Sequence, residues 1–513
     1  MKTVISLILF SLLSFSWTSY ASEEEILKQE GELIIKFKSQ VQSGEEDILK
    51  VLVDVINFHH LKDTLEEEKE VKVLNAYAWA NIYHVQIPEG ETLEHMIKEI
   101  QKLDDVEYVE PNYLFHVDAS TEAMDYQVAS AKPSSGTQSN LDASQVLASG
   151  GQSVTVAVID TGVDYTHKDI APYMWVNSGE IPGNGMDDDG NGYVDDINGY
   201  DFVNNDSDPY DDHYHGTHVS GIILSRQDSA HPVIKIMALK FLDKGGYGST
   251  GDAIRAIDYA IKNGAKILNN SWGGGPYSQA LRDSIIATYN ANRIFVVAAG
   301  NSAVNVDQYA SYPPSYLIPN MIAVAALDSA TNLAWFSNYG PTSVHVGAPG
   351  VSIYSTLPNQ KYGYLSGTSM ATPYVSGVAA MMLSKQPELM HLQVKKIIMD
   401  TSVSNASLEG YIGKGSVEPE DAVTVASSTT PDTHIPAYTP ASVPPSFGSV
   451  AQRSGQSAGM GCGMISELYA NDDDHFNSSS GVSLFFLAWP LLFVVMLRTL
   501  LLNQRRKFVF HKF

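Results

Sequence analysis

The sequence predicts an α/β fold with a mostly parallel sheet and helices on both faces, preceded by a small α+β domain. Short β-branched runs alternate with stretches of helical spacing between about residues 150 and 426. This alternation is typical of a parallel sheet that helices cover on both sides. Residues 22–118 combine two strand-like runs with one amphipathic segment, which indicates a separate small unit.

The expected elements follow from these patterns. The strands of the larger region are expected at Val154–Ile159, Ile234–Leu239, Lys266–Asn269, Ile294–Ala298 and Met321–Ala325. Its helices are expected at Thr250–Asn263, Ser278–Asn290 and Thr372–Ser384. In the smaller unit, strands are expected at Gly31–Phe37 and Ile82–Ile87, a helix between Thr92 and Leu103, and a closing segment at Val106–Tyr113.

Composition and charge limit the classes of function. The chain has 513 residues, of which 44% are hydrophobic, so it is long enough for more than one packed domain. Its formal charge of −26 repels phosphate backbones and argues against nucleic-acid binding. The single cysteine, Cys462, excludes an intramolecular disulfide, so cysteine pairing says nothing about the compartment.

The N-terminus predicts export. Lys2, an apolar run over residues 4–17 and the sequence Ser19-Tyr20-Ala21 form the pattern of a Sec signal peptide, residues 1–21. The alternative is an uncleaved membrane anchor, for which the run is short. The protein is therefore expected to be secreted or displayed at the cell surface.

The C-terminus predicts a linker and a tail. Residues 427–480 are rich in Ser, Thr and Pro and are expected to be a linker. Residues 481–513 hold an apolar stretch followed by basic residues, which is similar to bacterial sorting tails and suggests membrane association. Under that interpretation Cys462 is a processing or lipidation point; the alternative is a permanent transmembrane anchor.

Three segments carry candidate catalytic side chains. Asp160 ends an apolar strand, His215 begins a probable helix, and Ser369 precedes an apolar helix. Each has a structural explanation when taken alone, since many strands end in Asp and Ser is a good helix cap. His213, His215 and His218 also allow a zinc site, although the Glu of the common zinc-protease motif is absent from this segment.

Together the three segments resemble the signatures of the subtilisin-like serine peptidases. They read Asp160-Thr161-Gly162, His215-Gly216-Thr217-His218-Val219-Ser220-Gly221 and Gly367-Thr368-Ser369-Met370-Ala371-Thr372-Pro373. The order Asp, His, Ser is that of the subtilisin triad. The resemblance covers about residues 140–425 and implies a serine endopeptidase in which Ser369 attacks the peptide bond, His215 transfers protons and Asp160 orients the imidazole.

The resemblance extends to oxyanion and substrate sites. Asn301 matches the family residue whose amide faces the oxyanion; alternatively it only adopts a left-handed turn. Ser271, Trp272 and Gly273 resemble the strand that pairs with the substrate backbone. Ser311 aligns with the floor of the first specificity pocket, where a small neutral residue implies tolerance of bulky apolar side chains.

An acidic loop predicts calcium binding. Asp187, Asp189 and Asn191 occupy the first ligand positions of an EF-hand-like loop, Tyr193 would give its carbonyl, and Asp195 holds the ninth position. The closing Glu is missing, and the alternative is a solvated acidic loop. The family resemblance adds Asp169 as a ligand. A second site is conceivable among several polar residues: Asp201, Asn205, Asp206, Asp208, Asp211 and Asp212.

The N-terminal unit, residues 22–118, looks like a subtilisin propeptide. The resemblance implies that it assists folding and then blocks the cleft as an intramolecular inhibitor, with self-cleavage between Asp118 and Met124. Residues 119–149 would then form a connecting segment ahead of the catalytic domain, residues 150–426. The competing hypothesis is a non-catalytic binding protein on the same scaffold, which the intact triad argues against.

Overall fold

The computed structural model describes residues 28–38, 65–66, 71–77, 80–117, 151–227 and 232–439. The expected signal peptide, the connecting segment 119–149, the tail 481–513 and Cys462 lie outside the described residues. Within the described ranges, no helix is both long enough and apolar enough to cross a membrane.

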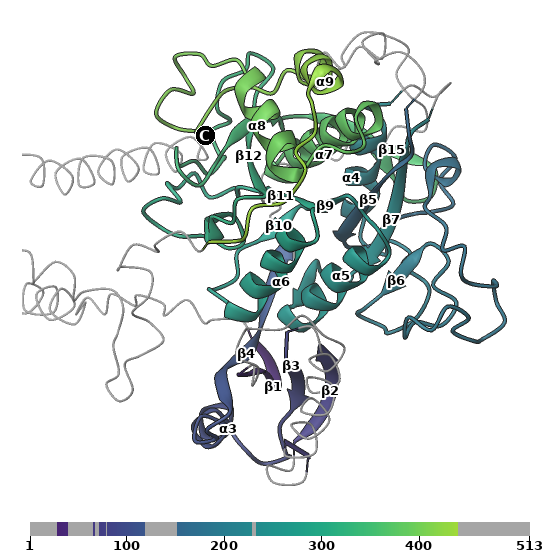
Figure 1. The fold of residues 1–513 in the computed structure, drawn as a ribbon, viewed down its shortest axis with the longest axis vertical. Helices are drawn as coiled ribbons and strands as arrows, with labels where there is room; N and C mark the ends of the chain where they lie inside the picture. The colour runs from purple at the N-terminus through teal and green to yellow at the C-terminus, as the bar shows by residue number, and fades with distance from the viewer. Residues whose placement is uncertain are drawn as a thin grey trace, which may run out of the picture. The chain divides into compact units, whose positions relative to one another are not determined.

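Seven parallel strands form the central sheet, in the order β13-β12-β11-β9-β5-β7-β6 (Figure 1). In that order, the strands are Val346–Pro349, Met321–Leu327, Ile294–Ala298, Ile267–Asn270, Val154–Asp160, Ile234–Lys240 and Gly199–Asp201. After β7 the chain returns to the other side of β5, where it forms β9. Such a change of direction opens a crevice at the carboxyl edge of a parallel sheet, beside the end of β5.

Helices cover both faces of this sheet (Figure 1). Val156 and Val158 of β5 belong to the core that includes α4 and α7, whereas Ala157 and Ile159 belong to the core that includes α5 and α6. The strand is therefore apolar on both sides, as parallel strands usually are. The helices are α4 (His215–Leu224), α5 (Thr250–Lys262), α6 (Gln279–Asn290), α7 (Thr368–Lys385), α8 (His391–Thr401) and α9 (Pro419–Ser428).

Each strand and helix expected between residues 150 and 426 has a counterpart, with two differences. Helix α7 begins at Thr368 instead of Thr372, so Ser369 lies inside its first turn and not ahead of it. The packed chain also continues beyond residue 426, where the linker was expected to begin. Tyr289 Oη donates to the carbonyl of Pro436 (2.9 Å), and Arg282 donates to Tyr438 Oη (3.0 Å), so residues up to Thr439 dock on the domain.

The N-terminal unit is an antiparallel sheet of order β4-β1-β3-β2, with one helix against it. Its elements are β1 (Lys28–Phe37), β2 (Lys72–Tyr77), β3 (Ile82–Gln86), α3 (Leu93–Ile100) and β4 (Val106–Val117). Leu93, Met96 and Ile100 are the buried residues of α3, which confirms the helical spacing in the sequence. This unit has its own apolar core, distinct from the two cores around the central sheet.

Strand β4 also joins the two units. Beyond its pairing with β1, it pairs with β8 (Tyr247–Ser249) and with β10 (Trp272–Gly273). Glu110 accepts hydrogen bonds from Ser278 Oγ (2.6 Å) and from the first two backbone amides of α6 (2.9 and 3.2 Å). Asn112 Oδ1 accepts from Gly251 N at the start of α5 (2.9 Å). Two helix N-termini, which lack intrahelical acceptors, therefore receive their acceptors from β4.

A partly buried basic pair, His345 and Lys395, lies between α8 and the edge of the sheet. His345 Nδ1 accepts from the amide of Ala323 (3.0 Å), which places the ring proton on Nε2. Nε2 lies 2.8 Å from Lys395 Nζ and donates to it, so Lys395 accepts as a neutral amine. Burial lowers the pKa of Lys395 to about 7.

We therefore expect stability to rise with pH above 7. The pKa of Lys395 is lower in the folded chain than in the unfolded chain, so the unfolded chain binds more protons between pH 7 and about 10.4. Relative to Lys395→Met, the wild type should gain about 2 kcal/mol between pH 7 and 9. Unfolding midpoints of both proteins measure this, in chains that also carry Ser369→Ala because the sequence predicts self-cleavage through Ser369. Parallel pH profiles would contradict the assignment.

Candidate active site

Asp160 is the last residue of β5, at the carboxyl edge of the central sheet, and its side chain is fully buried. Its Oδ1 accepts hydrogen bonds from Thr161 N (2.7 Å) and from His215 Nδ1 (2.8 Å). Because Nδ1 is the donor, the neutral imidazole presents Nε2 as an acceptor.

His215 is the first residue of α4. The next residue, Gly216, packs directly on the turn after β5: a Cβ atom at this position would lie 2.1 Å from the carbonyl oxygen of Gly162. Only glycine permits this approach, and the approach brings the imidazole within reach of Asp160. The glycine after the histidine is thus a geometric requirement of the pair.

Ser369 lies in the first turn of α7 and exchanges two hydrogen bonds with Ser271. Ser369 Oγ donates to the carbonyl of Ser271, and Ser271 Oγ donates to the carbonyl of Ser369, both at 3.1 Å. In a regular helix the amide of residue 373 would donate to the carbonyl of residue 369, but Pro373 has no N–H. The proline therefore leaves this carbonyl available to Ser271.

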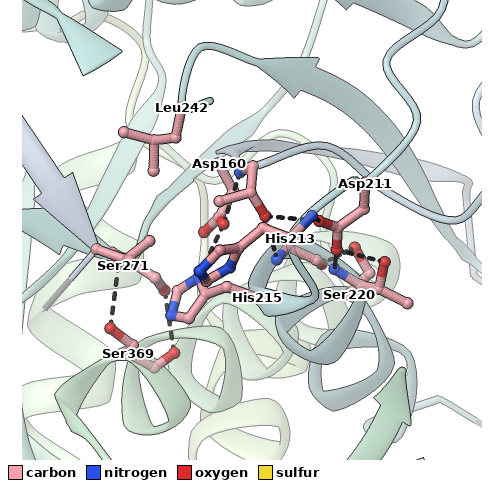
Figure 2. Close-up of polar contacts among 12 residues, drawn as sticks. Asp160, Asp211, His213, His215, Ser220, Leu242, Ser271 and Ser369 are labelled. Atoms are coloured by element: carbon pink, nitrogen blue, oxygen red, sulfur yellow. Dashed lines mark hydrogen bonds and ion pairs between the residues drawn. The ribbon is translucent and has the colours of Figure 1, made fainter. Parts of the chain in front are cut away.

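Figure 2 shows Asp160, His215 and Ser369 gathered at one place, with the imidazole between the carboxylate and the serine. They come from the end of β5, the start of α4 and the start of α7. Their burial is nearly complete, since Asp160 is 0%, His215 3% and Ser369 1% exposed. A carboxylate, an imidazole and a hydroxyl in this order can activate the hydroxyl as a nucleophile.

Asn301 follows β11 and lies next to the same helix turn. Its Oδ1 accepts from the backbone amide of Thr368 (2.8 Å) and from Thr368 Oγ1 (3.1 Å). Because Oδ1 faces Thr368, the NH₂ group of the Asn301 side chain points away from Thr368. The structure therefore brings the predicted oxyanion donor to the start of α7, one residue from Ser369.

The predicted substrate strand is paired with the chain itself. Trp272 pairs with Val117 and Gly273 with His116, while β8 pairs with the other edge of β4. The tail of the N-terminal unit thus forms the middle strand of three. Phe115, fully buried, makes an edge contact with Trp272 at a centroid distance of 5.5 Å. The strand β8 was not foreseen, because its sequence Tyr-Gly-Ser carries almost no strand signal.

Ser311 lies near this strand. Its amide donates to Ser315 Oγ (3.1 Å), and the adjacent Tyr312 forms a β-bridge with Gly275, two residues after β10. Ser311 is partly exposed. The structure therefore puts Ser311 close to the expected substrate cleft.

The neighbouring histidines are neutral. Burial lowers the pKa of His218 to about 3, and its Nε2 lies 3.2 Å from the carbonyl of Gly363. Burial and the nearby His215 lower the pKa of His213 to about 4. Among the described residues these histidines do not belong to any cluster with metal-ligand spacing, so the zinc alternative has no geometric support.

An acidic cluster occupies the predicted calcium loop. Carboxylate oxygens of Glu180, Asp187 and Asp189 lie within 4.8 Å of one another. Asp187 Oδ1 and Oδ2 accept from the amides of Gly190 (2.7 Å) and Gly192 (2.8 Å), which shapes the loop around it. Three oxygen donors of this kind suit a hard cation such as Ca²⁺. Glu180 was missed, because it lies seven residues before the loop motif.

The other predicted ligands differ in what the structure says of them. Asp195 accepts from the amides of Asn184 and Gly185. The Tyr193 ring packs against Tyr259 and Asn191 Nδ2 donates to Asp196, contacts that do not involve the Tyr193 carbonyl or the Asn191 side-chain oxygen, so these two atoms stay predicted ligands. Asp169 bonds Lys168 and Tyr362, so neither Asp169 nor Asp195 belongs to the acidic cluster. The second suggested site has no support either: Asp201 binds Asn204, Asp211 binds Thr217, and Asp212 binds Lys240.

Comparison with known proteins connects this geometry to a family. Residues 151–429 match the model of the subtilase family, and residues 29–112 match that of the fervidolysin N-terminal prodomain. The thermophilic serine proteinase of Bacillus sp. (strain AK1) is 33% identical over 79% of this chain and 90% of its own length. Subtilisin amylosacchariticus of Bacillus subtilis subsp. amylosacchariticus is 33% identical over 69% and 83%.

A solved structure shares the fold. Fervidolysin from Fervidobacterium pennivorans superposes with a TM-score of 0.58 at 24% identity, over 77% of this chain and 61% of its own. The subtilase match spans more than half of the chain and contains all three residues of the buried Asp–His–Ser group. The chain belongs to the subtilase family and is a serine-type endopeptidase that carries an N-terminal prodomain.

Proposed function

We propose that this enzyme hydrolyses proteins with Asp160, His215 and Ser369 as its catalytic triad. The observation that carries the proposal is the buried 2.8 Å hydrogen bond between Asp160 Oδ1 and His215 Nδ1, with Ser369 on the other side of the ring (Figure 2). This bond fixes the tautomer in which Nε2 can accept a proton. A purely structural histidine would not need a serine hydroxyl on the side of the ring that carries its second nitrogen.

The reaction would begin with a rotation of the Ser369 hydroxyl. The hydroxyl leaves the carbonyl of Ser271, turns toward His215 Nε2, and its oxygen attacks the peptide carbonyl while the imidazole takes the proton. The imidazolium, stabilised by Asp160, returns the proton to the leaving amine. Water then hydrolyses the acyl-enzyme by the same route, which regenerates Ser369.

The oxyanion of each tetrahedral intermediate would receive two hydrogen bonds. Asn301 offers its amide NH₂, held in orientation by the two bonds from Thr368 to its Oδ1. The backbone amide of Ser369 lies in the first turn of α7, where the helix itself provides no acceptor. Hydrogen-bond donors that are already held in position stabilise the negative charge on the oxyanion, because the protein does not have to rearrange as that charge develops.

We propose that the prodomain inhibits the enzyme through its own tail. Residues 114–117 lie between β8 and β10, as a peptide substrate would, and directly precede the predicted cleavage region Asp118–Met124 in the sequence. Phe115 packs against Trp272 within the same apolar cluster. The buried bonds of Glu110 and Asn112 to the starts of α6 and α5 anchor the tail after cleavage.

Calcium binding, substrate preference and export are supported by the sequence and by local geometry. Ca²⁺ would bind Glu180, Asp187 and Asp189 and neutralise their mutual repulsion, stabilising the loop between β5 and β6. Ser311 beside the cleft supports apolar side chains before the scissile bond. The signal peptide predicted at residues 1–21 supports export, and the sorting tail predicted at residues 481–513 supports a membrane-associated stage with processing at Cys462.

Replacing Ser369 by Ala should abolish both peptide hydrolysis and self-cleavage. We expect a loss of at least about 10⁴-fold in kcat, because no other hydroxyl takes the place of the nucleophile. Casein or peptide hydrolysis and mass spectrometry of the purified protein measure the two effects. A Ser369→Ala protein that still loses its prodomain when purified alone would contradict self-processing.

Removing calcium should lower the unfolding temperature. A site filled to a hundred times its Kd contributes about 2.7 kcal/mol, which corresponds to several degrees. Chelation should lower the midpoint of the wild type but have less effect on Glu180→Gln, which lacks one ligand charge. Glu409→Gln, at an exposed position away from the loop, is the control. Equal responses to chelation in the wild type and in Glu180→Gln would exclude this site.

Inhibition by the prodomain should weaken as pH rises toward 7. Burial raises the pKa of Glu110 to about 7, so the docked carboxyl binds a proton that the released one, with a pKa near 4.3, gives up. Docking is therefore favoured at low pH and loses this contribution as pH approaches 7.

The lag before activity appears in freshly purified precursor measures this effect. It should shorten from pH 5 to 7 in the wild type and in the control Glu107→Gln, at an exposed position of the same strand. The pH dependence should be weaker in Glu110→Gln, which has no carboxyl to titrate. If the lag of Glu110→Gln depends on pH as strongly as that of the wild type, Glu110 is not the group that titrates.

A further inference from the structure

Asp211 lies on the loop before α4, four residues ahead of His215, and is 1% exposed. Its carboxylate accepts four hydrogen bonds (Figure 2). Oδ1 accepts from Thr161 Oγ1 (2.9 Å) and from the amide of His213 (3.0 Å). Oδ2 accepts from the amide of Thr217 (2.8 Å) and from Thr217 Oγ1 (2.6 Å). Two donors meet each oxygen.

The donors belong to the two segments that carry the Asp–His pair. Thr161 follows Asp160, donates its amide to Asp160 Oδ1, and accepts the amide of Gly216 with its Oγ1 (3.0 Å). Thr217 lies two residues after His215, in the first turn of α4. Asp211 therefore connects the turn after β5 to the start of α4, on the side of the pair that faces away from Ser369 (Figure 2).

We propose that Asp211 is a positioning residue for peptide hydrolysis. Its carboxylate holds the turn of Asp160 against the first turn of α4 and so fixes the direction of the His215 ring relative to Ser369. The inference rests on the proposed roles of Asp160 and His215. Asp211 itself contacts neither the substrate nor the reacting atoms.

A simpler role is helix capping. The cap residue of α4, Tyr214, makes no side-chain capping bond, and Asp211 supplies an acceptor for the amide of Thr217 instead. Capping would require only Oδ2. The bond from Thr161 to Oδ1 adds nothing to the helix start, whereas it ties the residue next to Asp160 to the same carboxylate. The two roles therefore differ in what they predict for turnover.

The test compares two buried aspartates in the full-length, self-processed enzyme. Asp211→Asn replaces one carboxylate oxygen, which accepts two hydrogen bonds, by an NH₂ group. It should lower kcat by about 10²-fold, the effect expected when a catalytic group is misplaced by about 1 Å, while KM changes less than about threefold. It should also shift the low-field proton NMR signal of the hydrogen bond between His215 and Asp160. Asp201→Asn is the matched control.

Asp201 is also 1% exposed and accepts three hydrogen bonds, from Val203 N, Asn204 N and Asn204 Nδ2, at the end of β6. Its replacement should lower the melting temperature while leaving kcat within about twofold. If Asp211→Asn likewise loses only stability and retains kcat and the NMR signal, Asp211 is a structural cap and the inference is wrong.

A second variant covers the case in which Asp211→Asn does not fold. Thr161→Val removes the hydroxyl that links Asp211 to the turn of Asp160, and with it the acceptor of the Gly216 amide, but keeps the bonds between Asp211 and Thr217. It should lower kcat in the same direction, with the NMR signal shifted; normal turnover would overturn the inference. A wild type without hydrolytic activity would instead overturn the proposed function, and this inference with it.

Discussion

The structure depends on the close approach of the first turn of α4 to the end of β5. Gly216 allows the helix backbone to contact the turn at Gly162, and the imidazole of His215 then reaches the carboxylate of Asp160 at 2.8 Å. Both groups are buried, so their polar atoms need hydrogen-bond partners. The amide of Thr161 donates to Asp160, and the hydroxyl of the same threonine donates to the carboxylate of Asp211. Without that approach, the three side chains of the proposed triad would lie on separate elements and would not share one site.

The second feature that organises the molecule is the sharing of one strand by two units. Strand β4 is part of the sheet of the prodomain, and its last residues form the middle strand between β8 and β10. We propose that the same contacts serve folding and inhibition. Glu110 and Asn112 supply acceptors to the starts of α6 and α5, which lie next to β10 and β8 in the chain. A parallel sheet with long connections folds slowly, and a preformed partner that binds two helix starts and two edge strands offers a template.

Much of the fold and of the candidate site could be predicted from the sequence, because short stretches of residues determine them. The strands of the core are runs of apolar residues buried on both faces, and the triad segments combine a reactive residue with glycines and a proline whose effects are short-range, such as Pro373 freeing the carbonyl of Ser369. Features that depend on distant contacts were missed. Glu180 approaches Asp187 only when the loop folds, and β8 forms only because it pairs with β4. In the sequence Asp211 is one of several acidic residues, and only the folded chain brings Thr161 into hydrogen-bond contact with it.

The most direct test of the central claim is covalent labelling with phenylmethylsulfonyl fluoride, followed by mass spectrometry of the peptide that contains Ser369. The reagent reports the nucleophilicity of one hydroxyl and needs no knowledge of the natural substrate. The account predicts stoichiometric modification of Ser369 once the prodomain has been removed, with loss of peptide hydrolysis, and a labelling rate reduced by several orders of magnitude in His215→Ala. Modification that is absent from Ser369, or equally fast without the imidazole, would contradict it.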